Sequence, residues 1–193
     1  MRCDLCKEKN CDNGSPCFTK ESEALYQDTV ELEMMRAASS IEAEYYGELN
    51  RIQEIILFAK RLGYKKIGLA FCIGLSEEAA RVCEILTQYF EVHSVCCKTC
   101  SIPKASFKAE GNAKVGFISC NPAEQARILK ESGTELNLLL GLCVGHDALF
   151  IKHSHAYVVP LAAKDRVTGH NPLAAVYASA VFGKMKKTDM NNF

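Results

Sequence analysis

Cysteine recurs at one structural position in this chain, immediately after a stretch that is predicted to form a β-strand. The pattern occurs four times, at Cys72, Cys97, Cys120 and Cys143. Thiolate sulfur is a ligand for zinc and for iron–sulfur clusters. A single cysteine at the end of a strand is commonly a small buried hydrophobic residue. Four successive occurrences are better explained by a shared site that holds a metal ion or a cluster.

The junction after the fourth of these strands carries the most chemistry. An apolar run over residues 138–142 predicts a strand that is buried on both faces, and a helical pattern follows it. The turn between them places Cys143, His146 and Asp147 within five residues. Open α/β sheets bind ligands at the carboxyl ends of their strands, so this turn predicts a functional site. We expect His146 and Asp147 to be catalytic, with a structural hydrogen bond as the alternative for the histidine.

A repeated strand–helix pattern explains how residues so far apart in the sequence could meet. Strands are predicted over 66–72, 90–95, 114–119, 136–142 and 157–162, with helices between them. Right-handed crossovers return each strand in the same direction, so all carboxyl ends share one edge. The fold class is therefore predicted to be α/β, a doubly wound and mostly parallel five-stranded sheet. Adjacent strands lie about 4.8 Å apart, so thiols from four strands suit a [4Fe–4S] cluster better than a single zinc ion.

Basic residues accompany the cysteines at the same predicted edge. Lys98 follows Cys97, and the last strand is followed by Lys164, Arg166 and His170. Cationic side chains beside a metal centre are suited to hold an anion. We predict that these four residues bind a small anionic substrate.

The N-terminal segment has a different composition. Residues 1–20 contain Cys3, Cys6, Cys11 and Cys17 among Gly, Asn, Asp and Pro, and they have almost no core-forming side chains. We predict a cysteine-rich cap ordered by zinc or by a cluster, the spacing favouring neither. Residues 21–193 are predicted to be one α/β domain, with a helical lead-in over 21–63.

Composition limits the class of protein. Of the 193 residues, 23 are Lys or Arg and 23 are Asp or Glu, and this balance disfavours a nucleic-acid partner. No apolar run approaches the roughly 18 residues of a membrane span, and the polar N-terminus is not that of a signal peptide. The count of 11 cysteines is odd, which disfavours a disulfide framework. We expect a cytoplasmic protein that binds a metal or a small molecule; nothing in the sequence specifies its oligomeric state.

The motifs around the four cysteines also carry a resemblance. They are Cys72-Ile-Gly-Leu, Cys97-Lys98, Cys120-Asn-Pro, Gly-Leu-Cys143-Val-Gly-His-Asp and Lys-Asp-Arg166. Together with the cysteine-rich N-terminus, they are similar to those of a family of uncharacterised cysteine-rich proteins, found mainly in anaerobes and labelled only as metal-binding. The resemblance covers nearly the whole chain and implies metal or cluster binding with no assigned reaction. Cys100 stands where similar proteins are expected to have a small residue such as glycine, so Cys96, Cys97 and Cys100 all stay candidate ligands from their loop.

Three functions follow from these observations. The first is an iron–sulfur protein whose cluster acts as a Lewis acid on a small anionic substrate, with sulfur-containing anions among the candidates. The second is a non-enzymatic module that stores, senses or delivers zinc, iron or a cluster. The third is a thiol redox protein that uses Cys96, Cys97 and Cys100.

Overall fold

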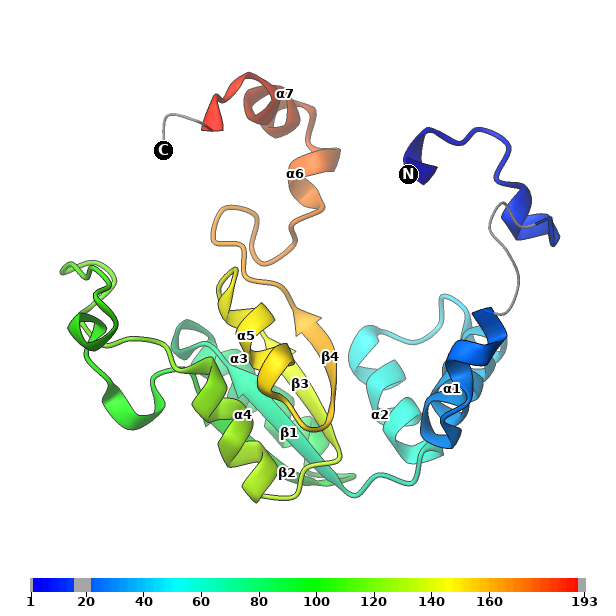
Figure 1. Cartoon of the computed structure of the whole chain (residues 1–193), viewed down its shortest axis with the longest axis horizontal. Coiled ribbons are helices and arrows are strands. Elements are labelled where there is room, and N and C mark those ends of the chain that lie inside the picture. The colour runs from blue at the N-terminus through cyan, green and yellow to red at the C-terminus, as the bar shows by residue number, and fades with distance from the viewer. Residues whose placement is uncertain (1, 16–21, 191–193) are drawn as a thin grey trace. The chain divides into compact units, whose positions relative to one another are not determined.

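The computed structural model describes residues 2–15 and 22–190, and the chain divides into two compact units, 1–46 and 47–193 (Figure 1). The division falls within the predicted helical lead-in. No helix in the described part of the chain is both long enough and apolar enough to cross a membrane.

The first unit consists of helical segments. Short 3-10 turns cover Cys3–Leu5, Asn10–Asn13 and Ser22–Tyr26, and the long helix α1 covers Thr29–Tyr45. Helix α1 begins where the Asp28 carboxylate accepts hydrogen bonds from the Val30 and Glu31 N–H groups. Every residue from 2 to 15 is exposed, so burial does not order this segment.

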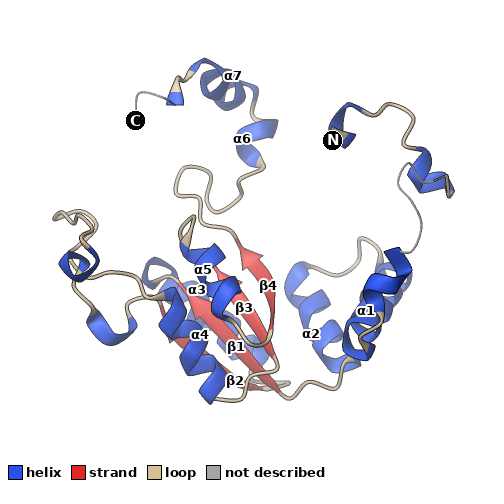
Figure 2. Cartoon of the chain, in the orientation of Figure 1, coloured by secondary structure: helices blue, strands red, loops and turns tan. Residues whose placement is uncertain are grey.

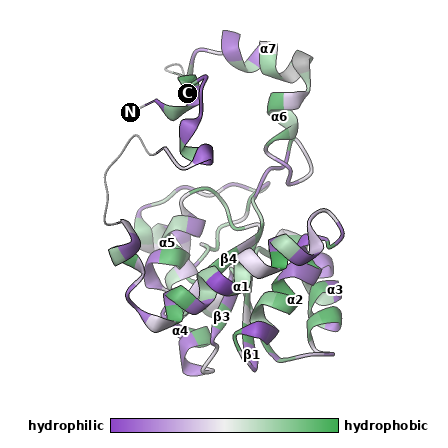
Figure 3. Cartoon of the chain, turned by 90° about the vertical axis from the view of Figure 1, so that its right-hand side faces the viewer, coloured by the Kyte–Doolittle hydropathy of each residue, from purple (hydrophilic) through white to green (hydrophobic). Residues whose placement is uncertain are grey.

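The second unit is an α/β domain (Figure 2). Its strands are β1 (Lys66–Phe71), β2 (Glu91–Cys96), β3 (Leu136–Leu140) and β4 (Tyr157–Ala162). Its helices are α2 (Arg51–Arg61), α3 (Ser76–Leu86), α4 (Pro122–Glu131), α5 (His146–His153), α6 (Ala174–Tyr177) and α7 (Ser179–Lys187). In α7 hydrophilic and hydrophobic residues are mixed along the helix (Figure 3).

The four strands form one parallel sheet in the order β2-β1-β3-β4. This confirms the α/β class and the parallel sheet, with four strands among the described residues in place of five. The chain moves from β1 to β2 on one side and then crosses back to β3 on the other. The order therefore reverses between β1 and β3, and the crevice outside the carboxyl ends at such a reversal is the usual ligand site of open α/β sheets.

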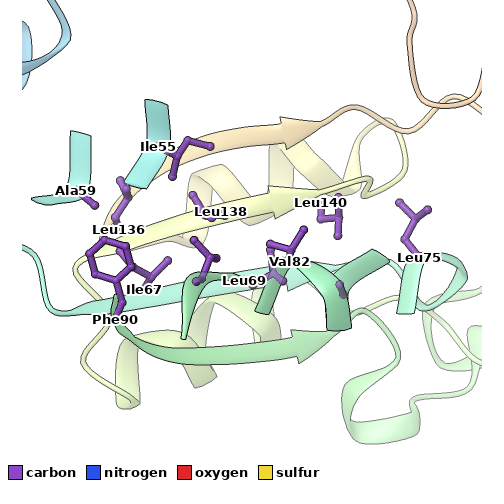
Figure 4. Packing of buried hydrophobic residues seen from close by; sticks show 12 residues of the cluster. Ile55, Ala59, Ile67, Leu69, Leu75, Val82, Phe90, Leu136, Leu138 and Leu140 are labelled. Atoms are coloured by element: carbon purple, nitrogen blue, oxygen red, sulfur yellow. The ribbon is translucent and has the colours of Figure 1, made fainter. Parts of the chain in front are cut away.

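Two apolar clusters cover the two faces of this sheet. Along β1, Ile67 and Leu69 belong to the cluster shared with α2 and α3, whereas Ala70 belongs to the cluster shared with α4 and α5. Figure 4 shows the first cluster, with Leu138 of β3 among its side chains. Cys72 continues the alternation of β1 and lies in the second cluster.

The predicted strand over 114–119 is wrong. Residues 97–121, all described, form a long excursion with short 3-10 turns at Thr99–Ser101 and Lys104–Phe107 and no strand (Figure 2). Val115 and Phe117 alternate as in a strand, but they are 56% and 66% exposed. Gly116 has a φ of 74°, which breaks an extended backbone. The excursion instead folds back on itself through an isolated bridge between Pro103 and Ile118.

The helices of the second unit begin in different ways. The Asn50 side chain forms a full capping box with Gln53 at the start of α2. Asn121 caps α4 with Pro122 in its first turn, but the Glu124 carboxylate binds Arg127 and does not complete a box. Helix α3 has no side-chain cap, because the Ser76 hydroxyl donates to the Ile73 carbonyl. The single predicted helix after residue 172 is divided into α6 and α7.

Candidate metal centre

The register of β1 and β2 places Cys72 beside Cys97. Phe71 pairs with Cys96, and the Cys97 N–H donates to the Phe71 carbonyl at 2.9 Å, which continues the ladder by one residue. Both cysteines are buried, with 7% and 2% of their surface exposed. Their thiols are hydrogen-bonded to each other. Sheet pairing alone therefore brings together two thiols that are 25 positions apart.

Cys120 reaches the same place from the end of the excursion. The Asn121 N–H donates to the Cys97 carbonyl at 2.8 Å, and this bond fixes the chain beside the end of β2 just before α4 begins. The Cys120 and Cys97 sulfurs are 3.7 Å apart. Three thiols thus form one cluster, the thiol triad of Cys72, Cys97 and Cys120, with Cys97 in the middle.

Cys143 lies near the triad but is held differently. It follows β3, and its sulfur accepts a hydrogen bond from the Arg166 guanidinium at 3.3 Å. The charge of Arg166 also interacts with Cys72 and Cys120, so the four cysteines belong to one neighbourhood. Among the described residues, Cys143 has no hydrogen bond to another thiol.

The thiol triad has strongly perturbed acidity. The hydrogen bond from Cys97 lowers the pKa of Cys72, helped by the Gly74 N–H and by Lys164. The pKa of Cys120 is lowered first by Cys97 and then by the charges of Lys98 and His146. The pKa of Cys97 is raised because its proton is held between the two neighbouring sulfurs and because it is buried. The three thiols titrate as a set, with anionic sulfur favoured at the outer positions and the proton retained in the middle.

The predicted cations lie around these sulfurs. Lys164 is hydrogen-bonded to Cys72, and Arg166 to Cys143. Lys98 donates to the Ile118 carbonyl at 2.5 Å, which ties the excursion to the end of β2. Within the described residues, none of the three pairs with a carboxylate. The site therefore carries positive charge that only the thiolates, or a bound anion, can balance.

Two of the other predicted site residues have structural partners. The Asp147 carboxylate accepts hydrogen bonds from the N–H groups of Gly145 and Ala148 at 2.9 and 2.8 Å, and so it orders the start of α5. The His170 Nδ1 accepts a hydrogen bond from the Asp165 N–H at 3.0 Å, which closes the turn that carries Arg166.

His146 is different, because its Nδ1 is buried and has no hydrogen-bond partner. Its ring is half-buried and interacts electrostatically with Cys120.

The other cysteines of the predicted loop have different hydrogen-bond partners, although Cys96 packs against the same apolar cluster as Cys72 and Cys97. Cys96 accepts a hydrogen bond from the Lys98 N–H, and the exposed Cys100 contacts the Glu124 carboxylate. Register therefore selects Cys97 as the member of this loop that faces Cys72. Cys83, predicted to be a core residue, is partly buried against the first apolar cluster, and burial raises its pKa.

Three of the four N-terminal cysteines lie in the described part of the chain. Cys3, Cys6 and Cys11 are exposed, and none of them is hydrogen-bonded to another described cysteine. Cys17 lies outside the described residues.

Sequence reasoning missed Gln125. Its side chain is fully buried, and its Nε2 donates to the carbonyls of Phe71 at 3.3 Å and Val95 at 2.7 Å. These carbonyls belong to the residue before Cys72 and the second residue before Cys97, so one amide holds the two strand ends together. The signal in the sequence is a polar residue one turn before Leu129 on the apolar stripe of α4.

The chemistry of the donor set, three thiols, suits a thiophilic metal. In the part of the chain that the structure describes, no group of three or more Cys, His, Asp or Glu side chains is placed so that it could hold a metal ion. The triad instead shares protons, and metal binding displaces the protons of thiol ligands. A tetrahedral ion with metal–sulfur bonds of about 2.3 Å holds neighbouring sulfurs roughly 3.8 Å apart. The Cys97 and Cys120 sulfurs already stand at 3.7 Å.

Comparison with known proteins gives a family without an assigned activity. The chain is 43% identical over 189 residues to the uncharacterized protein MJ0455 of Methanocaldococcus jannaschii, and the match covers 96% of this chain and 98% of that protein. No solved structure matches the chain. The family described as protein of unknown function DUF1847 matches residues 10–161, which include the whole thiol triad, Cys143 and His146. The chain therefore belongs to the DUF1847 family.

Proposed function

We propose that this protein binds a metal through the thiol triad at the carboxyl edge of its sheet. The observation that supports this most strongly is the contact of three thiols from β1, β2 and the end of the excursion. Thiolates brought together without a cation repel one another, so such an arrangement is most stable with a metal bound. The β3–α5 loop, which carries Cys143 and His146, supplies the fourth ligand.

A single zinc or iron ion is the first choice for this centre. The close contact between the Cys97 and Cys120 sulfurs matches neighbouring ligands of one ion, whereas the corners of a cubane hold their thiolates further apart. A [4Fe–4S] cluster is the second choice. It is favoured by the spread of the four cysteines over β1, β2, β3 and the start of α4.

The bound metal would act as a Lewis acid on a small anionic substrate. Three thiolates around a divalent ion leave a net negative charge, and Lys98, Lys164 and Arg166 surround it with positive charge. Arg166 is exposed, and its hydrogen bond to Cys143 uses only part of a guanidinium that has five N–H donors. The free donors suit a carboxylate or another oxyanion at the edge of the site.

Metal storage or delivery without catalysis is the second candidate function. It is favoured by the local roles of Asp147 and His170, whose acceptor atoms hold backbone N–H groups.

Under either function, the N-terminal cysteines Cys3, Cys6, Cys11 and Cys17 are proposed to bind a separate metal. Reduced thiols at this density suit a cytoplasmic protein.

Zinc affinity in matched variants tests the proposal. The full-length protein, reduced and kept anaerobic, would be titrated with zinc against a chromophoric chelator. We expect Cys97→Ser to weaken binding at the central site by at least about tenfold, because it removes the middle ligand. Cys96→Ser and Cys100→Ser are the controls and should stay within about threefold of wild type. Equal affinity in all four proteins would contradict the proposal.

A further inference from the structure

We propose that the His146 imidazole completes the metal centre and that Cys143 stands beside it as a free thiol held by Arg166. The inference rests on the proposed metal site and specifies its fourth ligand. It also assigns different roles to two residues of the same loop, both of which the sequence places at the edge of the sheet.

The contacts of Cys143 set it apart from the triad. Its sulfur is engaged by the Arg166 guanidinium at 3.3 Å, whereas each thiol of the triad is engaged by another thiol. Arg166 is in turn placed by the turn after β4, where the Asp165 carboxylate accepts hydrogen bonds from the Val167 and Thr168 N–H groups. Cys143 therefore already has an oriented cationic partner that does not depend on a metal.

His146 differs from Cys143 because its Nδ1 has no hydrogen-bond partner among the described residues. This nitrogen is fully buried, although burying a polar nitrogen without a hydrogen bond is unfavourable. The ring is close enough to Cys120 for the two side chains to interact electrostatically. A nitrogen with a free lone pair beside a cluster of thiols is a zinc ligand in Cys3His sites.

The local backbone explains how the loop presents the histidine. Gly145 has a φ of 86°, a left-handed conformation that turns the chain sharply. The His146 N–H donates back to the Cys143 carbonyl at 2.9 Å, so the two residues lie on one tight turn. Asp147 fixes this turn through the Gly145 and Ala148 N–H groups. The turn thus holds thiol and imidazole together in front of the triad.

The consequence is a reactive thiol next to a Lewis-acidic metal. Cys143 keeps its sulfur free, and the remaining donors of Arg166 can hold an anion beside it. The substrate class is then an anion with a centre that a thiol can approach while the metal polarises the same molecule.

Protection from alkylation separates ligands from free thiols. Cys120 and Cys143 are both partly buried, so they form a matched pair of reporters within one protein. The full-length protein would be loaded with zinc or stripped by a chelator, treated with iodoacetamide under anaerobic conditions, and mapped by peptide mass spectrometry. We expect zinc to slow the alkylation of Cys120 at least about tenfold and that of Cys143 less than about threefold, because only thiolates bound to the metal are protected.

The outcomes distinguish the two proposals. Protection of Cys143 to the same degree as Cys120 would overturn the inference and leave a four-thiolate centre. Absence of zinc protection at Cys120 would overturn the proposed metal site itself.

X-ray absorption at the zinc edge gives a second test that does not depend on accessibility. Zinc-loaded protein in which Cys3, Cys6 and Cys11 are serine, so that zinc occupies the central site alone, should show three sulfur ligands and one nitrogen ligand, and four sulfurs would contradict the inference. His146→Ala should weaken zinc binding by about tenfold or more, and Cys143→Ser should leave it within about threefold. The urea midpoint of each stripped variant shows whether it is folded. Loss of zinc in a folded Cys143→Ser protein, with His146→Ala unaffected, would reverse the assignment.

Discussion

At the scale of single residues, the site depends on side chains whose partners are supplied by neighbouring strands. Cys97 is hydrogen-bonded to thiols on both sides, and this contact makes it both the most buried and the least acidic member of the triad. Cys96 is adjacent in sequence and packs against the same apolar cluster, but its sulfur accepts a hydrogen bond from the Lys98 N–H and from no thiol among the described residues.

Gln125 is the residue whose loss should affect the site without removing a proposed ligand. Gln125→Leu leaves the carbonyls of Phe71 and Val95 without their buried donor. We expect a loss of about 1–3 kcal/mol in the free energy of unfolding, measured by urea denaturation of the metal-free protein. Gln88→Leu, on the exposed surface after α3, is the control and should change it by less than about 0.5 kcal/mol. A Gln125→Leu protein as stable as wild type would show that the bridge contributes nothing.

The sequence was sufficient to predict at which edge of the sheet the cysteines lie, but not which side chain each of them contacts. Cysteines after predicted strands indicated one edge of the sheet, and the structure brings Cys72, Cys97 and Cys120 together there. The choice between Cys96 and Cys97 depends on the register between β1 and β2, which no local pattern encodes. Arg166 as the partner of Cys143 depends likewise on the pairing of β3 with β4.

At the scale of elements, the excursion over 97–121 shows where periodicity misleads. Val115 and Phe117 alternate with smaller residues as in a strand, but both are exposed and the backbone turns at Gly116. The buried apolar runs of β1 and β3 and the helix caps at Asn50 and Asn121 were sufficient for the α/β class. What the sequence could not give was the route by which Cys120 reaches the triad.

Gly141 is the point at which β3 meets the turn before Cys143. Its φ is 60°, and an added Cβ would lie 2.3 Å from the buried Leu75 Cδ1 and 3.7 Å from the Lys164 Cε. Gly141→Ala should therefore destabilise the protein by about 1–3 kcal/mol, because the backbone is strained and the Leu75 side chain must move.

The measurement for this variant is urea denaturation, and the free energy of unfolding should fall. Gly183→Ala in α7 is the control, because an added Cβ there meets nothing within 4 Å and alanine favours a helix by up to about 1 kcal/mol. If Gly141→Ala has the same free energy of unfolding as Gly183→Ala, then neither the backbone at Gly141 nor the contact with Leu75 excludes a side chain at this position.

At the scale of the whole molecule, the chain carries cysteines in both of its compact units. The described thiols of the first unit, Cys3, Cys6 and Cys11, are exposed, whereas the thiol triad of the second unit lies in or against an apolar cluster. The sheet can therefore assemble the central site without any contribution from the N-terminal cysteines.

Substitution of the N-terminal cysteines tests this independence. Serine at Cys3, Cys6 and Cys11 together should remove the metal of the first unit and leave zinc affinity at the central site within about threefold of wild type. The measurement is total zinc content together with the alkylation map of Cys72 and Cys120. Loss of protection at Cys120 in this variant would mean that the two groups of thiols share one centre.

The most direct test of the central claim is the metal content of the full-length protein purified under anaerobic conditions. Wild type would be compared with the variant in which Cys72, Cys97 and Cys120 are all serine, with metals measured by plasma mass spectrometry and acid-labile sulfide measured in parallel. We predict that the variant lacks about one zinc or iron equivalent that wild type retains, or the iron and sulfide of one cluster. Equal metal content in the two folded proteins, or a wild type purified without metal, would contradict the account.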